Sequence, residues 1–84
     1  MHELSIATTL LETIKKTCKE HNITRIYKVH LSVGDPPSVQ YDALSFCFET
    51  ISKDTIAEGA ELSMENTGRG IYIQKLDCET EDGC

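Results

Sequence analysis

An apolar stripe with helical spacing occupies the first quarter of this 84-residue chain. Its members recur at intervals of three and four residues, which is typical of an amphipathic helix with one buried face. They are Leu4, Ala7, Leu11, Ile14 and Cys18. Lysines gather at the end of the stripe, at positions 15, 16 and 19, where the helix dipole favours cations. The pattern predicts a helix from Glu3 to about Glu20, and such a helix needs a second layer to cover its apolar face.

The next segment, Thr24 to Val33, changes to a spacing of two residues. Apolar and polar side chains alternate along it and β-branched residues are enriched, which is typical of a strand with one buried face. Ile26 is the apolar residue that falls on the opposite face. The predicted buried positions are Tyr27, Val29, Leu31 and Val33.

A turn sequence, Gly34-Asp35-Pro36-Pro37, then ends the strand. Ser38 follows at a position suited to capping a helix, and we predict a second helix from about Val39 to Lys53. Its predicted core face consists of Ala43, Leu44, Cys47, Phe48 and Ile51.

Two further strands follow this helix. Gly59 opens the first, in which Ala60, Leu62 and Met64 alternate with polar residues. The sequence Asn66-Thr67-Gly68-Arg69 has the composition of a hairpin turn, after which strand character resumes from Gly70 to Cys78. The apolar positions of this last strand, Ile73 and Leu76 among them, change phase. This change predicts a β-bulge near Gln74-Lys75.

The order helix-strand-helix-strand-strand packs most simply as an α+β two-layer sandwich, a three-stranded mixed sheet with two helices on one face. We expect a single domain over residues 1–78 and an acidic C-terminal tail over residues 79–84. The edge strand at residues 70–78 leaves two oligomeric states open, a monomer and a homodimer paired through this edge.

Length and charge exclude several classes of function. A chain this short buries only about 60% of its unfolded surface, too little to enclose a deep active site, and no nucleophile–base pair is present. A net charge of −6 gives no electrostatic basis for binding nucleic acid. No apolar run is long enough for a membrane span, and the charged start does not resemble a signal peptide. We therefore expect a cytoplasmic protein that is not an enzyme.

The cysteines are expected to be free thiols, because cytoplasmic proteins rarely contain disulfides. Cys18 and Cys47 fall on the apolar faces of the two predicted helices, so we expect them in the core. Cys78 and Cys84 lack the Cys-x-x-Cys spacing of a structural zinc site. Structural zinc is therefore not expected.

The triplet Met1-His2-Glu3 is the strongest candidate metal site. With histidine in second place, the α-amine, the His2 amide nitrogen and the His2 imidazole can bind one ion in a plane. Nitrogen donors of this kind suit Ni(II) or Cu(II) better than magnesium or calcium. Glu3 or a donor from another molecule would fill the fourth position. The alternative is a chance histidine after the initiator methionine.

The other two histidines do not strengthen a metal site. His21 lies at the far end of the first predicted helix, roughly 27 Å away at the helical rise, so it cannot share a site with His2. His30 lies on the polar face of a strand, where a hydrogen-bonded surface histidine is the commoner case. Both are expected to be structural or solvated side chains.

Four segments resemble the HypA/HybF family of nickel-incorporation proteins. They are Met1-His2-Glu3-Leu4-Ser5-Ile6-Ala7, Val33-Gly34, Ala43-Leu44-Ser45-Phe46-Cys47-Phe48-Glu49 and Thr55-Ile56-Ala57-Glu58-Gly59-Ala60-Glu61-Leu62. In that family a zinc module with two Cys-x-x-Cys pairs is inserted before a last strand that is similar to residues 67–73. Here those residues follow Glu65-Asn66 directly, so the module is expected to be missing, with a hairpin turn in its place.

The resemblance implies a nickel metallochaperone. It implies that the chain binds Ni(II) with His2 as the principal ligand, Glu3 as a neighbour of the metal and the Met1 amine as an additional ligand. It also implies two partners, a HypB-type GTPase and the large-subunit precursor of a nickel enzyme such as hydrogenase. The competing hypothesis is an interaction module that kept the HypA scaffold and lost metal transfer together with the zinc module.

Overall fold

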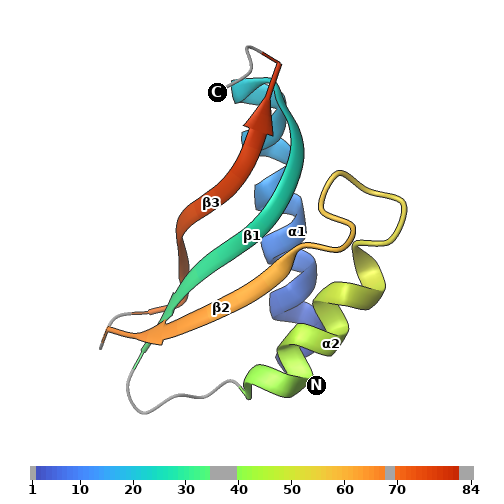
Figure 1. Ribbon diagram of the computed structural model, residues 1–84. Helices are drawn as coiled ribbons and strands as arrows, with labels where there is room; N and C mark the ends of the chain where they lie inside the picture. Colours follow the sequence, from blue (N-terminus) through green and yellow to red (C-terminus); the bar gives the residue numbers. More distant parts are fainter. Residues whose placement is uncertain (1, 35–39, 68–69, 82–84) are drawn as a thin grey trace.

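The computed structural model describes residues 2–34, 40–67 and 70–81. Two helices pack on one face of a three-stranded sheet, and no described helix covers the other face (Figure 1). The predicted α+β two-layer sandwich and its order of elements are confirmed. The elements are α1 (His2–His21), β1 (Ile23–Val33), α2 (Tyr41–Ile51), β2 (Glu61–Asn66) and β3 (Tyr72–Thr80).

The central strand of the sheet is β1, in the order β2-β1-β3. It pairs in parallel with β2 and antiparallel with β3. A parallel pair needs a crossover connection, which α2 supplies. The predicted hairpin at residues 66–69 is therefore wrong, because β2 and β3 lie on opposite sides of β1. The Thr67 N–H instead donates to the Val33 carbonyl at 3.2 Å, and Gly68 and Arg69 lie outside the described residues.

The pairing of β1 with β3 has three register shifts, of which one is at Thr24 and the other two are described here because they set which side chains face the helices. His30 pairs with Lys75 and Leu31 with Ile73, so Gln74 is the extra residue, and the predicted bulge near Gln74-Lys75 is confirmed.

The second bulge is on β1, between the pairs Ile26–Cys78 and Lys28–Asp77, where Tyr27 is the extra residue. It reverses the alternation, so Ile26 is 1% exposed and Tyr27 is 50% exposed. The prediction that Tyr27 faces the core is wrong for this reason.

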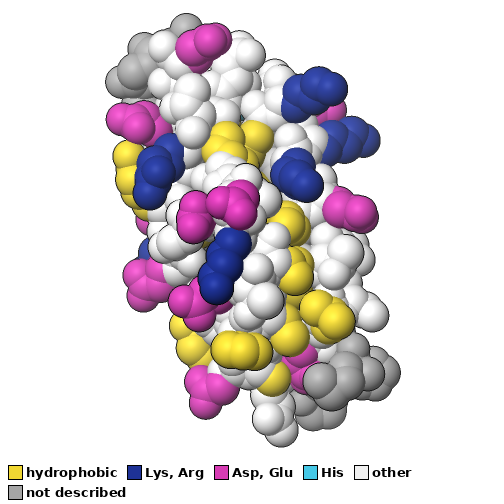
Figure 2. Space-filling view, turned by 90° about the vertical axis from the view of Figure 1, so that its right-hand side faces the viewer, with side chains coloured by type: hydrophobic (Ala, Val, Ile, Leu, Met, Phe, Trp, Pro, Cys, Tyr) yellow, Lys and Arg dark blue, Asp and Glu magenta, His cyan; other side chains and the backbone are white. Residues whose placement is uncertain are grey.

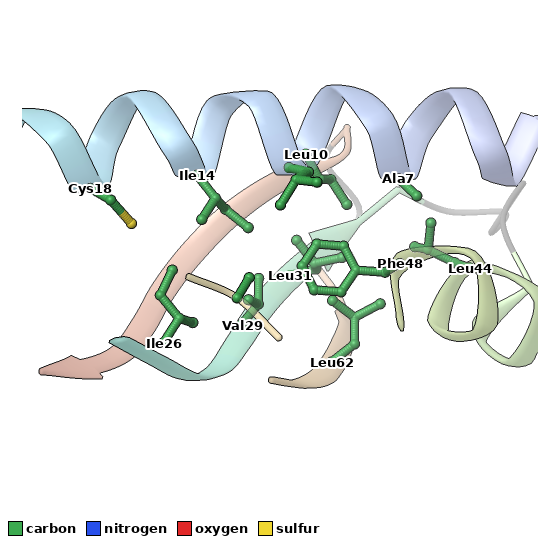
Figure 3. Close-up of a cluster of buried hydrophobic side chains, with 12 residues drawn as sticks. Ala7, Leu10, Ile14, Cys18, Ile26, Val29, Leu31, Leu44, Phe48 and Leu62 are labelled. Atoms are coloured by element: carbon green, nitrogen blue, oxygen red, sulfur yellow. The ribbon is translucent and has the colours of Figure 1, made fainter. Parts of the chain in front are cut away.

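The core lies between the sheet and the inner faces of the helices (Figure 3). Each element contributes to it, but Leu4, which was predicted on the buried stripe of α1, is 48% exposed. Phe48 of α2 is inserted between Leu31 of β1 and the edge strand residue Leu62. Cys18 is buried and Cys47 is half-buried against the same core, which confirms the prediction for both. The remaining buried members are Ala7, Leu10, Leu11, Ile14, Ile26, Val29, Leu44 and Ala57.

The ends of α2 and β3 differ from the prediction. Helix α2 begins at Tyr41 with Gln40 as its N-cap, two residues later than expected, and no side chain caps it. The predicted cap Ser38 lies outside the described residues. Strand β3 runs two residues past the predicted end, because Thr80 still pairs with Ile23. The Glu81 N–H then donates to the Asn22 carbonyl at 2.9 Å.

Candidate metal centre

The predicted nickel ligands lie at the start of α1. This helix begins at His2, Glu3 is half-buried in its first turn, and Met1 lies outside the described residues. The first N–H groups of a helix have no carbonyl partner within it. The His2 amide is one of these groups, so a metal ion that displaces its proton breaks no helical hydrogen bond. The backbone at His2 is therefore free for the predicted chelate.

The described first turns of the two helices have acidic side chains. Helices α1 and α2 begin at the same end of the fold (Figure 1). Each has a carboxylate in its first turn, Glu3 in α1 and Asp42 in α2. Among the residues that the structure describes, α1 has no Lys or Arg before Lys15, and α2 has none. The carboxylates oppose the positive ends of the helix dipoles and so reduce the cost of holding a cation here.

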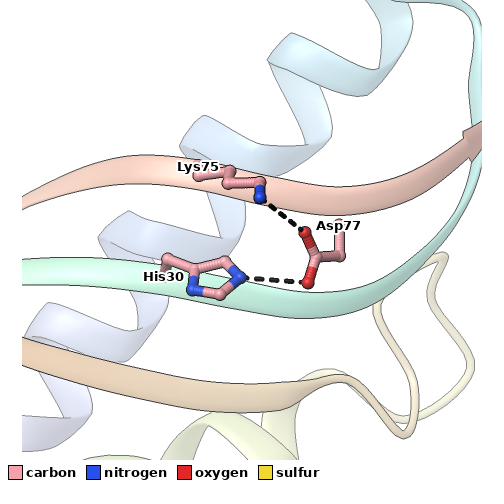
Figure 4. Close-up of polar contacts among 3 residues, drawn as sticks. All are labelled: His30, Lys75 and Asp77. Carbon is pink, nitrogen blue, oxygen red and sulfur yellow. Dashed lines mark hydrogen bonds and ion pairs between the residues drawn. The ribbon is translucent and has the colours of Figure 1, made fainter.

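His21 and His30 are placed as the sequence predicted. His21 is exposed at the opposite end of α1 from His2. His30 lies on the open face of the sheet, where its Nε2 donates to Asp77 Oδ2 at 3.0 Å (Figure 4). Lys75 Nζ lies 3.7 Å from the other oxygen of this carboxylate. The contact confirms His30 as a hydrogen-bonded histidine on the polar face.

Asp77 is a residue whose role the sequence did not indicate. In the sequence it only precedes the acidic C-terminal segment, but β3 aligns it with Lys28 of β1. The hydrogen bond from His30 holds the pKa of Asp77 below its ordinary value, and the charges of His30, Lys75 and Lys28 act in the same direction. The signal that links these residues is strand register, which a single sequence does not contain.

The described residues hold no other candidate centre. No group of three or more His, Cys, Asp or Glu side chains among them could hold a metal ion. Cys18, Cys47 and Cys78 are free thiols, and Cys84 lies outside the description. Burial raises the pKa of the Cys18 thiol, and the nearby Cys78 raises it further, so Cys18 stays protonated and unreactive.

An open groove of about 760 Å³ separates α1 from β3. Aliphatic side chains such as Leu10, Ile73 and Leu76 line it together with hydroxyl groups of α1, and the described residues of its lining include no His, Cys, Asp or Glu. None of the described helices is long and apolar enough to span a membrane.

Comparison with known proteins gives a consistent result. A family model described as hydrogenase/urease nickel incorporation, metallochaperone, hypA matches residues 1–81. A hydrogenase maturation factor HypA from Methanococcus maripaludis is 38% identical over 86 residues, covering 96% of this chain and 67% of the relative. The HypA of Methanosarcina mazei is 42% identical over 79 residues, covering 94% of this chain and 54% of the relative. The chain thus spans about half to two thirds of these relatives.

Solved structures agree on the fold. The solution structure of the Ni metallochaperone HypA from Helicobacter pylori has a TM-score of 0.80 at 12% identity, covering 94% of this chain and 98% of that one. A second solution structure of a HypA protein has a TM-score of 0.66 at 17% identity, covering 89% of this chain and 71% of that one. At these identities the likeness concerns the fold alone.

Proposed function

Because this chain belongs to the HypA family of hydrogenase/urease nickel-incorporation metallochaperones, we propose that it binds Ni(II) at its N-terminus and delivers it to a nickel-enzyme precursor. The family match from residue 1 is the observation that supports this most, since it includes the Met1-His2-Glu3 triplet. The proposed ligands are the Met1 amine, the His2 amide nitrogen and the His2 imidazole, with Glu3 beside the ion.

The geometry of a helix start favours this arrangement. The His2 amide belongs to the unpaired first turn of α1, and the carboxylates of Glu3 and Asp42 are at the same end of the molecule. The site would supply three nitrogens in a plane, which suits the square-planar preference of Ni(II). The open fourth position would let a partner's ligand enter before the ion leaves. We propose transfer by such ligand exchange, with no catalytic step.

We propose that the chain acts in the cytoplasm with a HypB-type GTPase and the large-subunit precursor of a nickel enzyme, and that residues 1–78 are the acting domain. The two Cys-x-x-Cys pairs of the family's zinc module have no counterpart between β2 and β3. We therefore propose that the chain needs no structural zinc. Thermal unfolding of purified protein before and after treatment with a metal chelator tests this. We expect the melting temperature to be unchanged, and a large decrease in melting temperature after chelation would contradict the proposal.

The experiment for nickel binding is a Ni(II) titration of untagged protein, because any residue added before Met1 removes the α-amine from the chelate. We expect one ion per chain, a d–d absorption band typical of planar nitrogen ligation, and loss of both in His2→Ala. His21→Ala is the matched control and should bind as the parent does. Affinity should fall as pH falls, since an amine and an amide must lose protons. Tight binding that survives His2→Ala would remove His2 from the site.

A second function is suggested by the absence of the zinc-module cysteines between β2 and β3. In this alternative the chain is a scaffold that kept protein contacts and lost metal transfer together with the zinc module. Untagged protein that binds no nickel, yet still binds a HypB-type GTPase, would support this alternative.

A further inference from the structure

The most exposed large apolar side chain of the described residues belongs to Phe46, in the middle of α2. It is 68% exposed, whereas Phe48 two positions later is 1% exposed. At about 100° per residue, Phe46 lies roughly 200° around the helix from the buried Leu44, so it points away from the core. A phenylalanine this exposed contributes little to the packing of its own chain.

Other apolar side chains accompany Phe46 along the contact between the two helices. Leu4 of α1 is 48% exposed and lies on the flank opposite to the residues that line the β3 groove, hence towards α2. On α2, Tyr41 marks the flank next to β2, since its hydroxyl donates to the Leu62 carbonyl. The half-buried Ala43 and Cys47 lie on the other flank, towards α1.

We call Leu4, Ala43, Phe46 and Cys47 the apolar seam. Figure 2 views this side of the molecule and shows hydrophobic side chains gathered in its middle and lower part. Its lower end is the end at which α1 and α2 begin. The seam therefore lies at the same end of the molecule as the proposed nickel ligands.

The charges around the lower part of the seam are mostly negative. Acidic side chains flank the hydrophobic ones in the lower part of Figure 2, whereas most Lys and Arg side chains lie in its upper half. Asp42 and Glu49 are exposed on α2, and Glu3 belongs to the first turn of α1. Helix α1 has its lysines in its second half, from Lys15 onwards. The seam thus has an acidic rim.

We propose that the apolar seam and its acidic rim bind a partner protein whose surface has an apolar recess surrounded by Lys or Arg. This inference deepens the proposed function, because such contact would bring the partner's metal ligands to the N-terminus. The rim would speed association by attraction, and Phe46 in the recess would slow dissociation.

The negative charge of the rim indicates which kind of molecule can bind the seam. A second copy in a two-fold dimer would bring the same acidic rim against itself, at a net charge of −6 per chain. Nucleic acid and anionic lipid would be repelled for the same reason. A basic partner protein is the occupant that the charges favour.

The experiment measures binding of two probes by calorimetry and stopped flow: a HypB-type GTPase and the large-subunit precursor of a nickel enzyme, both from the same organism. Phe46→Ser should weaken binding of at least one probe about tenfold or more, mainly through faster dissociation. Asp42→Lys with Glu49→Lys should slow association and reduce its dependence on salt. The matched controls are Tyr27→Ser, an exposed aromatic on the open face of the sheet, and Glu58→Lys, an exposed acid between α2 and β2.

Three results would overturn the proposal: neither probe binds the parent chain, Phe46→Ser changes neither affinity by more than the controls do, or Phe46→Ser splits a homodimer without affecting either probe. A nickel titration of the same variants separates this proposal from the proposed function. Nickel binding should be unchanged in Phe46→Ser. A chain that binds no nickel but shows Phe46-dependent binding would refute the nickel site and leave the docking surface supported.

Discussion

The two phenylalanines of α2 allow one stringent test of the structure, because they are the same residue type two positions apart on one helix. Phe48 is 1% exposed, and its ring packs from α2 against β1 and β2. Phe48→Ala would therefore leave a cavity that the surrounding strands cannot close. Such truncations cost about 3–5 kcal/mol. An 84-residue domain has a total stability of roughly 4–13 kcal/mol. The loss is therefore a large part of the stability and should lower the melting temperature by about 12 °C or more.

Phe46→Ala should behave in the opposite way. The side chain is 68% exposed, and alanine is the better helix former by a few tenths of a kcal/mol, so stability should change by less than about 0.5 kcal/mol or rise slightly. Urea unfolding followed by circular dichroism at 222 nm measures both variants against the parent chain. The reasoning is refuted if Phe48→Ala costs less than about 1 kcal/mol, or if both variants lose similar stability.

Three further predictions concern single contacts. Tyr41→Phe should cost about 1 kcal/mol in urea unfolding, because it removes the 2.7 Å hydrogen bond to the Leu62 carbonyl, and an unchanged midpoint would argue against that bond. In carboxyl NMR titrations Asp77 should titrate below its ordinary pKa, and His30→Ala should raise this pKa towards 3.8. Because folding lowers the pKa of Asp77, the contact should stabilise the fold at pH values above the unfolded-state pKa, and this stabilisation should be lost as the pH falls through the folded-state pKa. A free energy of unfolding that increases as the pH falls over this range would contradict the contact. Gly59→Ala should lower the free energy of unfolding by about 1 kcal/mol, because the φ angle of +80° is strained for alanine even though no atom lies within 4 Å of the added Cβ. An unchanged free energy of unfolding in the same urea assay would mean that Gly59 has another backbone conformation.

Periodicity in the sequence predicted correctly which helices and strands form. It failed where the pairing between strands decides which side chains face the core. The change of phase between Ile73 and Leu76 predicted the β3 bulge correctly, because an extra residue shows in the strand's own pattern. The β1 bulge at Tyr27 was missed, although Ile26 out of phase was its signal. The aromatic ring of Tyr27 resembles a core residue in sequence, but the bulge turns it to the surface, where its hydroxyl donates to Glu79.

The hairpin error has a different physical cause. Turn composition at residues 66–69 is a local signal, whereas the choice of neighbour for β2 depends on the crossover through α2, which lies before it in the chain. The same limit applies to the site. The proposed N-terminal chelate involves three adjacent residues, so proposing it requires no knowledge of the fold, but the His30–Asp77 pair and the seam between α1 and α2 join distant segments. These appear only when the register and the packing of the helices are known.

The central position of β1 has a consequence for how the chain folds during its synthesis. Both of its neighbours are made after it, and its pairing with β3 joins residues roughly forty or more positions apart, as in the pair Ser32–Tyr72. While β3 is still inside the ribosome, one side of β1 has no partner in its own chain and can pair with a neighbouring nascent chain. Any insertion between β2 and β3 would lengthen this interval, so a chain with a short connection closes its sheet soonest.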